Sequence, residues 1–141
     1  MPDVIRLAHV ALTVSDLDRS VPWYEALFGA KPNHLLQGES FNAVVWSLGG
    51  ETVVLHEFTH QPSTTTFDEH RSGLDHLAFA CSSRVELEAW TARLDDLGVS
   101  HSEIVDASYG SGLSFRDPDN IALEIFASPA PATYPTPERK E

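Results

Sequence analysis

Three side chains that can bind a metal ion occupy related positions in the sequence. His9 and His76 each lie in a run whose residues alternate between two faces, LAHVALTV and GLDHLAFAC, as is typical of β-strands. Glu124 lies between Leu123 and Ile125, so its carboxylate projects from the face opposite an apolar face. A carboxylate withdrawn from water needs a partner or a metal ion. Two imidazoles and one carboxylate form a facial set that leaves coordination positions open, which predicts a catalytic metal site.

The sequence around these residues is repeated once. An offset of 67 residues superimposes His9 on His76, and an offset of 68 residues superimposes His56 on Glu124. A difference of one residue in a loop accounts for the change of offset, and the chain is therefore interpreted as a tandem repeat. If the two repeats pair symmetrically, all four side chains are expected to face a common cavity.

Each repeat is predicted to contain a strand, a helix and three further strands. Capping signatures at residues 15–18 and 83–86 open the two helices, and Gly29 and Gly98 end them. Pro22 is expected to mark the first turn of the first helix, with the regular helix running from about Ser20 onward. The expected strands are residues 7–14, 32–36, 41–48 and 52–58 in the first repeat, and 73–81, 100–105, 112–116 and 121–126 in the second.

This pattern predicts one α+β domain over residues 1–127, built from two tandem βαβββ modules. Module 1 is expected over residues 5–58 and module 2 over residues 73–127. The polar segment 59–72 is interpreted as a linker. The proline-rich residues 128–141 are expected to form a flexible tail.

The composition excludes several classes of partner. A net charge of −12, from 21 acidic and 9 basic residues, repels phosphate backbones and anionic lipid surfaces, so neither nucleic acid nor a membrane is expected to bind. Cys81 is the single cysteine, so an intrachain disulfide cannot form. No basic and apolar leader opens the sequence and no apolar run is long enough to span a membrane, so a cytoplasmic protein is expected.

Three segments resemble signatures of a known superfamily. They are HVALTVSDLDRSVPWYEALFG, GLDHLAFAC and FRDPDNIALEIF. The sequence resembles the vicinal oxygen chelate superfamily, which includes glyoxalase I, fosfomycin-resistance thiol transferases, extradiol dioxygenases and bleomycin-binding proteins. The resemblance covers about residues 5–127. It implies an eight-stranded open cup around a divalent metal ion, which binds the substrate through two adjacent oxygens.

The resemblance also implies a set of metal ligands. His9 matches the ligand of the first module, His76 that of the second, and Glu124 the final carboxylate. His56 falls on the fourth ligand position, which is a glutamate in glyoxalase I. Glu57 is the rival of His56, but alternation along the strand is expected to turn Glu57 to the outer face.

Other positions bear on the substrate. Trp46 and Ser114 resemble pocket-lining positions in relatives and are expected to bind substrate. Glyoxalase I usually has an arginine at the position of Thr13 that grips the glutathione carboxylates, so a different substrate is expected here. Fosfomycin enzymes have a threonine at the position of Ala11, which argues against phosphonate binding.

The resulting functional expectation is a metal-dependent enzyme with glyoxalase-like lyase or isomerase chemistry. Glu124 would also act as the general base. The alternatives are an extradiol-type dioxygenase and a binding protein of the bleomycin-resistance type that takes up a drug or metabolite without catalysis. The expected cofactor is a divalent ion, with zinc, nickel, manganese and iron as the candidates. The expected partners are a small-molecule substrate and a second copy of the chain in a homodimer.

Overall fold

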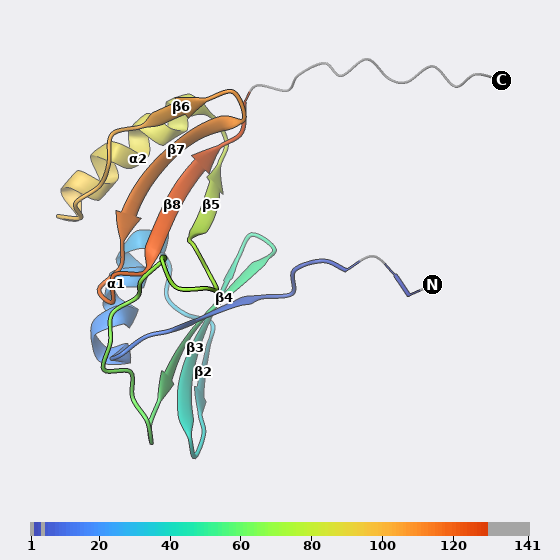
Figure 1. Ribbon diagram of the computed structural model, residues 1–141, viewed down its shortest axis with the longest axis vertical. Coiled ribbons are helices and arrows are strands. Elements are labelled where there is room, and N and C mark those ends of the chain that lie inside the picture. The colour runs from blue at the N-terminus through green and yellow to red at the C-terminus, as the bar shows by residue number, and fades with distance from the viewer. Residues whose placement is uncertain (1, 4, 130–141) are drawn as a thin grey trace. The chain divides into compact units, whose positions relative to one another are not determined.

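Each half of the chain folds as one strand, one helix and three further strands, as the repeat predicts (Figure 1). The first half contains β1 (Val10–Thr13), α1 (Leu17–Phe28), β2 (His34–Gln37), β3 (Phe41–Leu48) and β4 (Glu51–Phe58). The second half contains β5 (Leu77–Cys81), α2 (Arg84–Asp96), β6 (Val105–Ala107), β7 (Gly110–Arg116) and β8 (Ala122–Ala127). The α+β class and the two tandem βαβββ modules are therefore confirmed.

This computed structural model describes residues 2, 3 and 5–129. Of the predicted tail at residues 128–141, all but Ser128 and Pro129 lie outside the described residues. The chain forms two compact units. The first unit ends at Arg71 and also includes the turn Asp117–Ile121, whereas β7 and β8, which this turn joins, belong to the second unit.

The two modules share one sheet topology. The strand orders are β1-β4-β3-β2 in the first sheet and β5-β8-β7-β6 in the second. In each sheet the first strand of the module pairs in parallel with its last strand, and the other pairings are antiparallel. This pairing brings the strands that follow His9 and His76 beside the strands that carry His56 and Glu124.

The core of the first unit lies between α1 and one face of its sheet. Tyr24 of α1 is fully buried, and its ring centroid lies 6.3 Å from that of Trp46 on β3. Phe28 contacts the same indole at 5.5 Å. Burying large aromatic side chains in this way is a main source of stability for a small domain.

The first helix begins earlier than expected. It starts at Leu17, and Pro22 lies inside it rather than in its first turn. The helix start is stabilised by two carboxylates: Asp16 accepts a hydrogen bond from the Asp18 N–H at 2.9 Å, and Glu57 accepts one from the Leu17 N–H at 2.9 Å. These two bonds satisfy backbone N–H groups in the first turn of α1. The helix therefore tolerates the loss of the one backbone hydrogen bond that Pro22 cannot donate.

Regular pairing in the second module also differs from the prediction near residues 100–105. The strand β6 is formed by Val105–Ala107 instead, and His101 makes only an isolated bridge with Phe115. The Ser102 hydroxyl accepts a hydrogen bond from the Ser114 N–H at 3.0 Å. A serine side chain thus takes the place of a backbone partner, which is how such residues interrupt a strand ladder.

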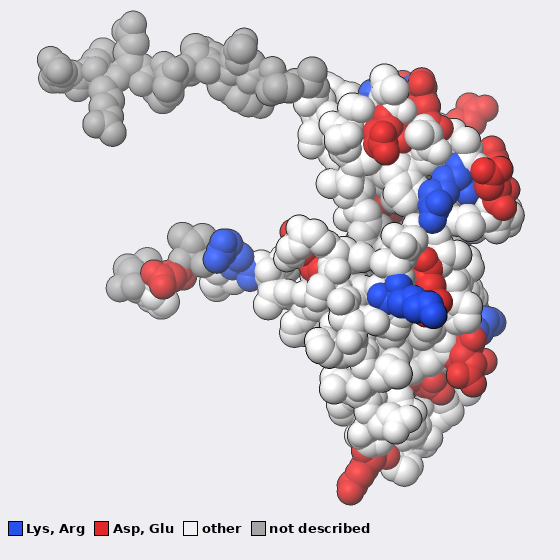
Figure 2. Space-filling model, turned by 180° about the vertical axis from the view of Figure 1, so that it is seen from behind, with Lys and Arg blue, Asp and Glu red and all other residues white. Residues whose placement is uncertain are grey.

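The charge distribution agrees with the acidic composition. On the face drawn in Figure 2, acidic side chains are spread over both units and basic side chains occupy few places. Neither of the helices in the described part of the chain is long and apolar enough to cross a membrane.

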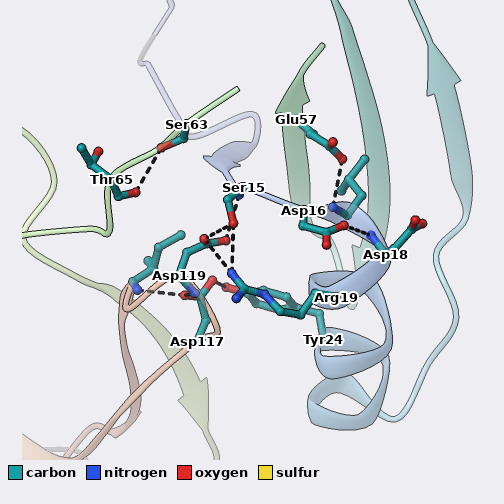
Figure 3. A network of polar contacts seen from close by, with 12 residues as sticks. Ser15, Asp16, Asp18, Arg19, Tyr24, Glu57, Ser63, Thr65, Asp117 and Asp119 are labelled. Atoms are coloured by element: carbon teal, nitrogen blue, oxygen red, sulfur yellow. Dashed lines mark hydrogen bonds and ion pairs between the residues drawn. The ribbon is translucent and has the colours of Figure 1, made fainter. Parts of the chain in front are cut away.

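The turn Asp117–Ile121 is held by a buried carboxylate (Figure 3). Asp117 is 6% exposed and accepts hydrogen bonds from the Tyr24 hydroxyl at 2.8 Å and from the N–H groups of Asp119 and Ile121 at 2.8 Å each. Burial raises the pKa of Asp117 despite these bonds, and burial together with the Asp117 charge raises the pKa of the Tyr24 hydroxyl.

A second aspartate ties the same turn to the beginning of α1. Asp119 is 6% exposed and accepts hydrogen bonds from the Ser15 N–H at 3.0 Å, from the Ser15 hydroxyl and from the Arg19 guanidinium at 3.0 Å. Donors on three groups therefore neutralise a carboxylate that would otherwise be costly to bury.

Replacing the buried phenol tests this network. Tyr24→Phe removes the donor to a buried carboxylate, so we expect the free energy of unfolding to fall by about 2 kcal/mol at pH 7, measured by urea denaturation. Because the folded-state pKa of Asp117 is raised, the cost of its buried charge grows as pH rises above the ordinary value of 3.8. The loss should therefore shrink as the pH is lowered towards 4.

The control for this variant is Tyr109→Phe, because Tyr109 is 74% exposed. It should leave the free energy of unfolding unchanged. Equal stability of Tyr24→Phe and the unmodified chain at pH 7 would show that the bond to Asp117 contributes nothing.

Candidate metal centre

The second unit brings two of the predicted ligands together. His76 lies directly before β5, and its Nε2 atom is 3.8 Å from the Oε2 atom of Glu124 on β8. This separation is too long for a hydrogen bond. Because each donor would lie about 2.0–2.2 Å from an ion such as zinc, two donors that share it can be at most about 4.4 Å apart. Both side chains keep some exposed surface, so the pair remains accessible.

A neighbouring carboxylate orients the His76 ring. Asp75 Oδ1 lies 2.7 Å from His76 Nδ1. An ionised carboxylate can only accept a hydrogen bond, so Nδ1 is the donor. When the ring is neutral, this leaves the lone pair on Nε2, the atom that is near Glu124. Asp75 was not among the residues predicted from the sequence, although an acidic residue next to a candidate ligand is a signal that sequence alone provides.

The surroundings of Glu124 are open on its side of the sheet. In the strand register Glu124 pairs with Ala78 on β5 and with Ser114 on β7. Ser114 is exposed, so this predicted substrate-binding residue lies directly beside the candidate ligand. A Cβ atom at Gly112 would lie 3.1 Å from Glu124 Cδ and 3.3 Å from each carboxylate oxygen. The carboxylate therefore occupies the space that a side chain at Gly112 would fill.

The first unit carries the other two candidates. His9 is exposed and lies directly before β1. His56 lies on β4, is half-buried, and stacks on the Phe41 ring with a centroid distance of 4.2 Å and an interplanar angle of 22°. The Phe58 ring lies 4.8 Å from the same imidazole. His56 is thus part of an aromatic group where β3 begins and β4 ends.

Glu57 lies on the opposite face of β4 from His56, because successive side chains of a strand alternate. Its carboxylate binds the Leu17 N–H at the beginning of α1, at 2.9 Å. This agrees with the expectation that Glu57 turns away from the face of His56. Its role at the helix terminus could not be seen in the sequence, because the two residues are far apart in the chain.

The strand registers of the two modules differ by two residues. His56 pairs with Thr13 in the first sheet, whereas Glu124 pairs with Ala78, the counterpart of Ala11, in the second. The equivalence of His56 and Glu124 predicted from the offset of 68 is therefore not reproduced. A shift of two residues preserves the face but moves the side chain along the strand by roughly 7 Å.

Trp46 occupies a different environment from the one predicted. It is fully buried among the aromatic residues beneath α1, and its indole N–H donates to the Ala30 carbonyl at 3.0 Å. This is the position of a core residue, and it departs from the expectation that Trp46 binds substrate. Val53, the partner of Trp46 on β4, is buried too. The alternation of apolar residues on β4 is therefore the sequence signal that this face of the sheet belongs to the core.

Another group of potential ligands lies in the segment predicted as a linker. Within residues 2–3 and 5–129, Asp68, Glu69 and His70 are the one set of three whose ligand atoms lie within 4.8 Å of one another. Hydrogen bonds from the backbone and ring of His70 lower the pKa of Asp68. Asp68 and His70 are exposed and bonded to each other. These hydrogen bonds account for the closeness of the two side chains without a bound ion.

A groove of about 470 Å³ lies in the first unit between the beginning of α1 and strands β2 and β3. Leu35 and Val44 form part of its apolar wall, and Asp16, Asp18 and Glu57 are its acidic residues. None of the four predicted ligands lines this groove. It is therefore separate from the candidate metal centre.

The chain is similar to known proteins of one superfamily, both in sequence and in fold. The chain matches the model of the Glyoxalase/Bleomycin resistance protein/Dioxygenase superfamily over residues 6–125. It is 36% identical to a glyoxylase/bleomycin resistance protein/dioxygenase domain from Frankia sp. EAN1pec, with a TM-score of 0.81 over 90% of this chain and 100% of the other. No curated protein matches the chain.

Two more distant structures share the fold. A glyoxalase family protein from Enterococcus faecalis is 21% identical, with a TM-score of 0.71 over 86% of this chain and 96% of the other. The fosfomycin resistance protein FosX from Listeria monocytogenes, complexed with Mn(II) and sulfate ion, is 21% identical, with a TM-score of 0.67 over 90% and 95%. At this level of identity the likeness concerns the fold alone.

The helix cap made by Glu57 can be tested by substitution. Glu57→Ala leaves the Leu17 N–H without its acceptor and removes a negative charge from the positive end of α1. We expect the free energy of unfolding to fall by about 1 kcal/mol, measured by urea denaturation. Glu57→Gln, which keeps an acceptor oxygen, should lose less. The matched control is Glu51→Ala on the same strand, where the side chain is exposed; an equal loss there would argue against the cap.

Proposed function

Because the chain belongs to the Glyoxalase/Bleomycin resistance protein/Dioxygenase superfamily, we propose that it is a metal-dependent enzyme with glyoxalase-like lyase or isomerase chemistry. Its substrate is a small molecule that offers two adjacent oxygens to the ion. The proposed ligands are His9, His76 and Glu124, with His56 as a weaker fourth. The observation that carries the proposal is the 3.8 Å separation of His76 Nε2 and Glu124 Oε2.

The donor set fits a divalent ion. An imidazole nitrogen and a carboxylate oxygen suit zinc, nickel, manganese and iron alike, so these four ions remain the candidates. The ring of His76 presents Nε2 because Nδ1 is bonded to Asp75, which is the arrangement found around many metal-bound histidines. The Mn(II) complex of FosX, a protein of the same fold, also supports a divalent cofactor.

The chemistry divides between the ion and the protein. When bound, a divalent ion would supply Lewis-acid stabilisation of the negative charge that develops on the substrate oxygens. Glu124 would act as the general base that takes a proton from the carbon beside a carbonyl, since a carboxylate has a second oxygen free to accept it. Ser114, exposed and opposite Glu124 in the register, would donate a hydrogen bond that orients the substrate.

Elemental analysis of protein purified without chelator, followed by metal titration of single variants, tests the ligand set. His9→Ala, His76→Ala and Glu124→Ala should each nearly abolish binding, because each removes one of three main donors. His56→Ala should weaken binding less. Glu57→Ala is the control and should bind normally, since its carboxylate caps α1.

The outcomes separate the candidate functions. Restoration of lyase or isomerase activity on α-ketoaldehyde–thiol adducts by zinc, nickel or manganese supports the proposal. Ring opening of catechols with ferrous iron and air would identify a dioxygenase instead. Absence of metal from the unmodified protein, with no activity after reconstitution, would contradict an enzyme and leave a small-molecule binding protein.

We further propose that the chain forms a homodimer in the cytoplasm. The edge strand β2 supports the dimer, because Leu35 is 72% exposed and Leu36 is 52% exposed on a strand whose outer edge has no neighbour among the described strands. Light scattering at micromolar concentration should give twice the mass of the chain. A monomer mass under these conditions would contradict the dimer.

A further inference from the structure

We propose that Asp75 and Gly112 are positioning residues that set the geometry of the His76–Glu124 pair before an ion binds. The inference rests on the proposed function and deepens it, because it says how the second unit prepares two ligands. Neither residue would touch the ion or the substrate. Asp75 would act through the His76 ring, and Gly112 through the Glu124 carboxylate.

Asp75 fixes which nitrogen of His76 can bind. The Asp75 Oδ1 to His76 Nδ1 distance is 2.7 Å, the length of a charge-assisted hydrogen bond. A free neutral imidazole interconverts between two tautomers, and only one of them has its lone pair on Nε2. The bond to Asp75 selects that tautomer and also holds the plane of the ring. Both effects favour the atom that lies 3.8 Å from Glu124.

Gly112 provides space for the carboxylate. A Cβ atom built on Gly112 would lie within 3.3 Å of Cδ, Oε1 and Oε2 of Glu124, closer than nine in ten real contacts of this kind. Gly112 lies on β7, two residues from Ser114, which is the direct partner of Glu124. The Glu124 side chain therefore leans along the sheet over Gly112 rather than standing above its own partner.

The backbone does not account for glycine at this position. Gly110 on the same strand has a φ of 144° and is required by its conformation, and Gly112 is not among the glycines with positive φ. The feature that a side chain at Gly112 would disturb is the Glu124 carboxylate. Adding one methyl group would displace it by a few tenths of an ångström. Because the displaced atoms end a flexible side chain, the fold should survive.

The first test needs no metal. Long-range proton–nitrogen spectra at pH 8 report which nitrogen of the neutral His76 ring carries the proton. We expect the Nδ1–H tautomer in the unmodified protein and a large shift towards Nε2–H in Asp75→Ala. The matched control is Asp95→Asn, which alters a similar exposed pair, Asp95 Oδ1 and His101 Nε2 at 2.7 Å, and should leave His76 unchanged. The same tautomer in Asp75→Ala and the unmodified protein would overturn the role of Asp75.

The second test measures Zn(II) binding by competition with a chromophoric chelator. Asp75→Ala and Gly112→Ala should each weaken binding about 10-fold, as is usual when a residue that supports a ligand is lost. Asp95→Asn should bind normally. The effect of Gly112→Ala should be much smaller in a Glu124→Asp background, because the shorter side chain withdraws its carboxylate from the added methyl group. An equal loss in both backgrounds would show that Gly112 does not act through Glu124.

The two proposals fail in different ways. If the unmodified protein binds no zinc, nickel, manganese or iron, the proposed function fails, and the tautomer measurement still decides the role of Asp75. If the unmodified protein binds zinc and the Asp75→Ala and Gly112→Ala variants bind it equally well, the proposed function stands and this inference is wrong.

Discussion

Parallel pairing of the first and last strands of each module is the constraint on which the candidate site depends. In the second module it places β5 beside β8, so that a histidine at the beginning of one strand and a carboxylate on the other come within 3.8 Å. Parallel neighbours need a long connection, and the helix and two intervening strands supply it. The face opposite α2 is thereby left with small residues and two ligands, while apolar residues on the other face, among them Leu123 and Ile125, are buried in the core.

The second determinant of the architecture is a pair of buried carboxylates that lie far in the sequence from the residues they bind. Asp117 and Asp119 hold the turn between β7 and β8 within the first unit, by bonds to Tyr24, Ser15 and Arg19. Each carboxylate is almost fully buried, and each would be costly without its donors. The chain thus uses charged groups in two ways: saturated with hydrogen bonds where they shape the fold, and partly exposed where they are candidates for chemistry.

Much of this could be predicted from the sequence, because it depends on local alternation and capping. Period-two patterns and helix signals predict the order of elements in each module and the α+β fold class. The same patterns place three candidate ligands at or next to strands: His9, His76 and Glu124. The predictions that were wrong concern how elements distant in the sequence pack against one another. The register that separates His56 from the counterpart of Glu124 by two residues is fixed by packing of the whole sheet, and an offset in a sequence comparison cannot resolve it. Trp46 was predicted to line the substrate pocket and is buried instead. Its burial depends on how the helix α1 packs on the strand β3, which the sequence of β3 alone does not show.

The measurement that tests the account most directly is X-ray absorption spectroscopy of the zinc-loaded protein, because it counts the imidazole rings around the ion. The ligand set proposed here predicts nitrogen and oxygen neighbours at about 2.0–2.2 Å and outer-shell scattering from at least two imidazoles, with the bound zinc and its imidazole scattering nearly lost in His9→Ala and in His76→Ala. A spectrum without imidazole scattering, or one that neither substitution alters, would contradict the central claim that these histidines hold the metal.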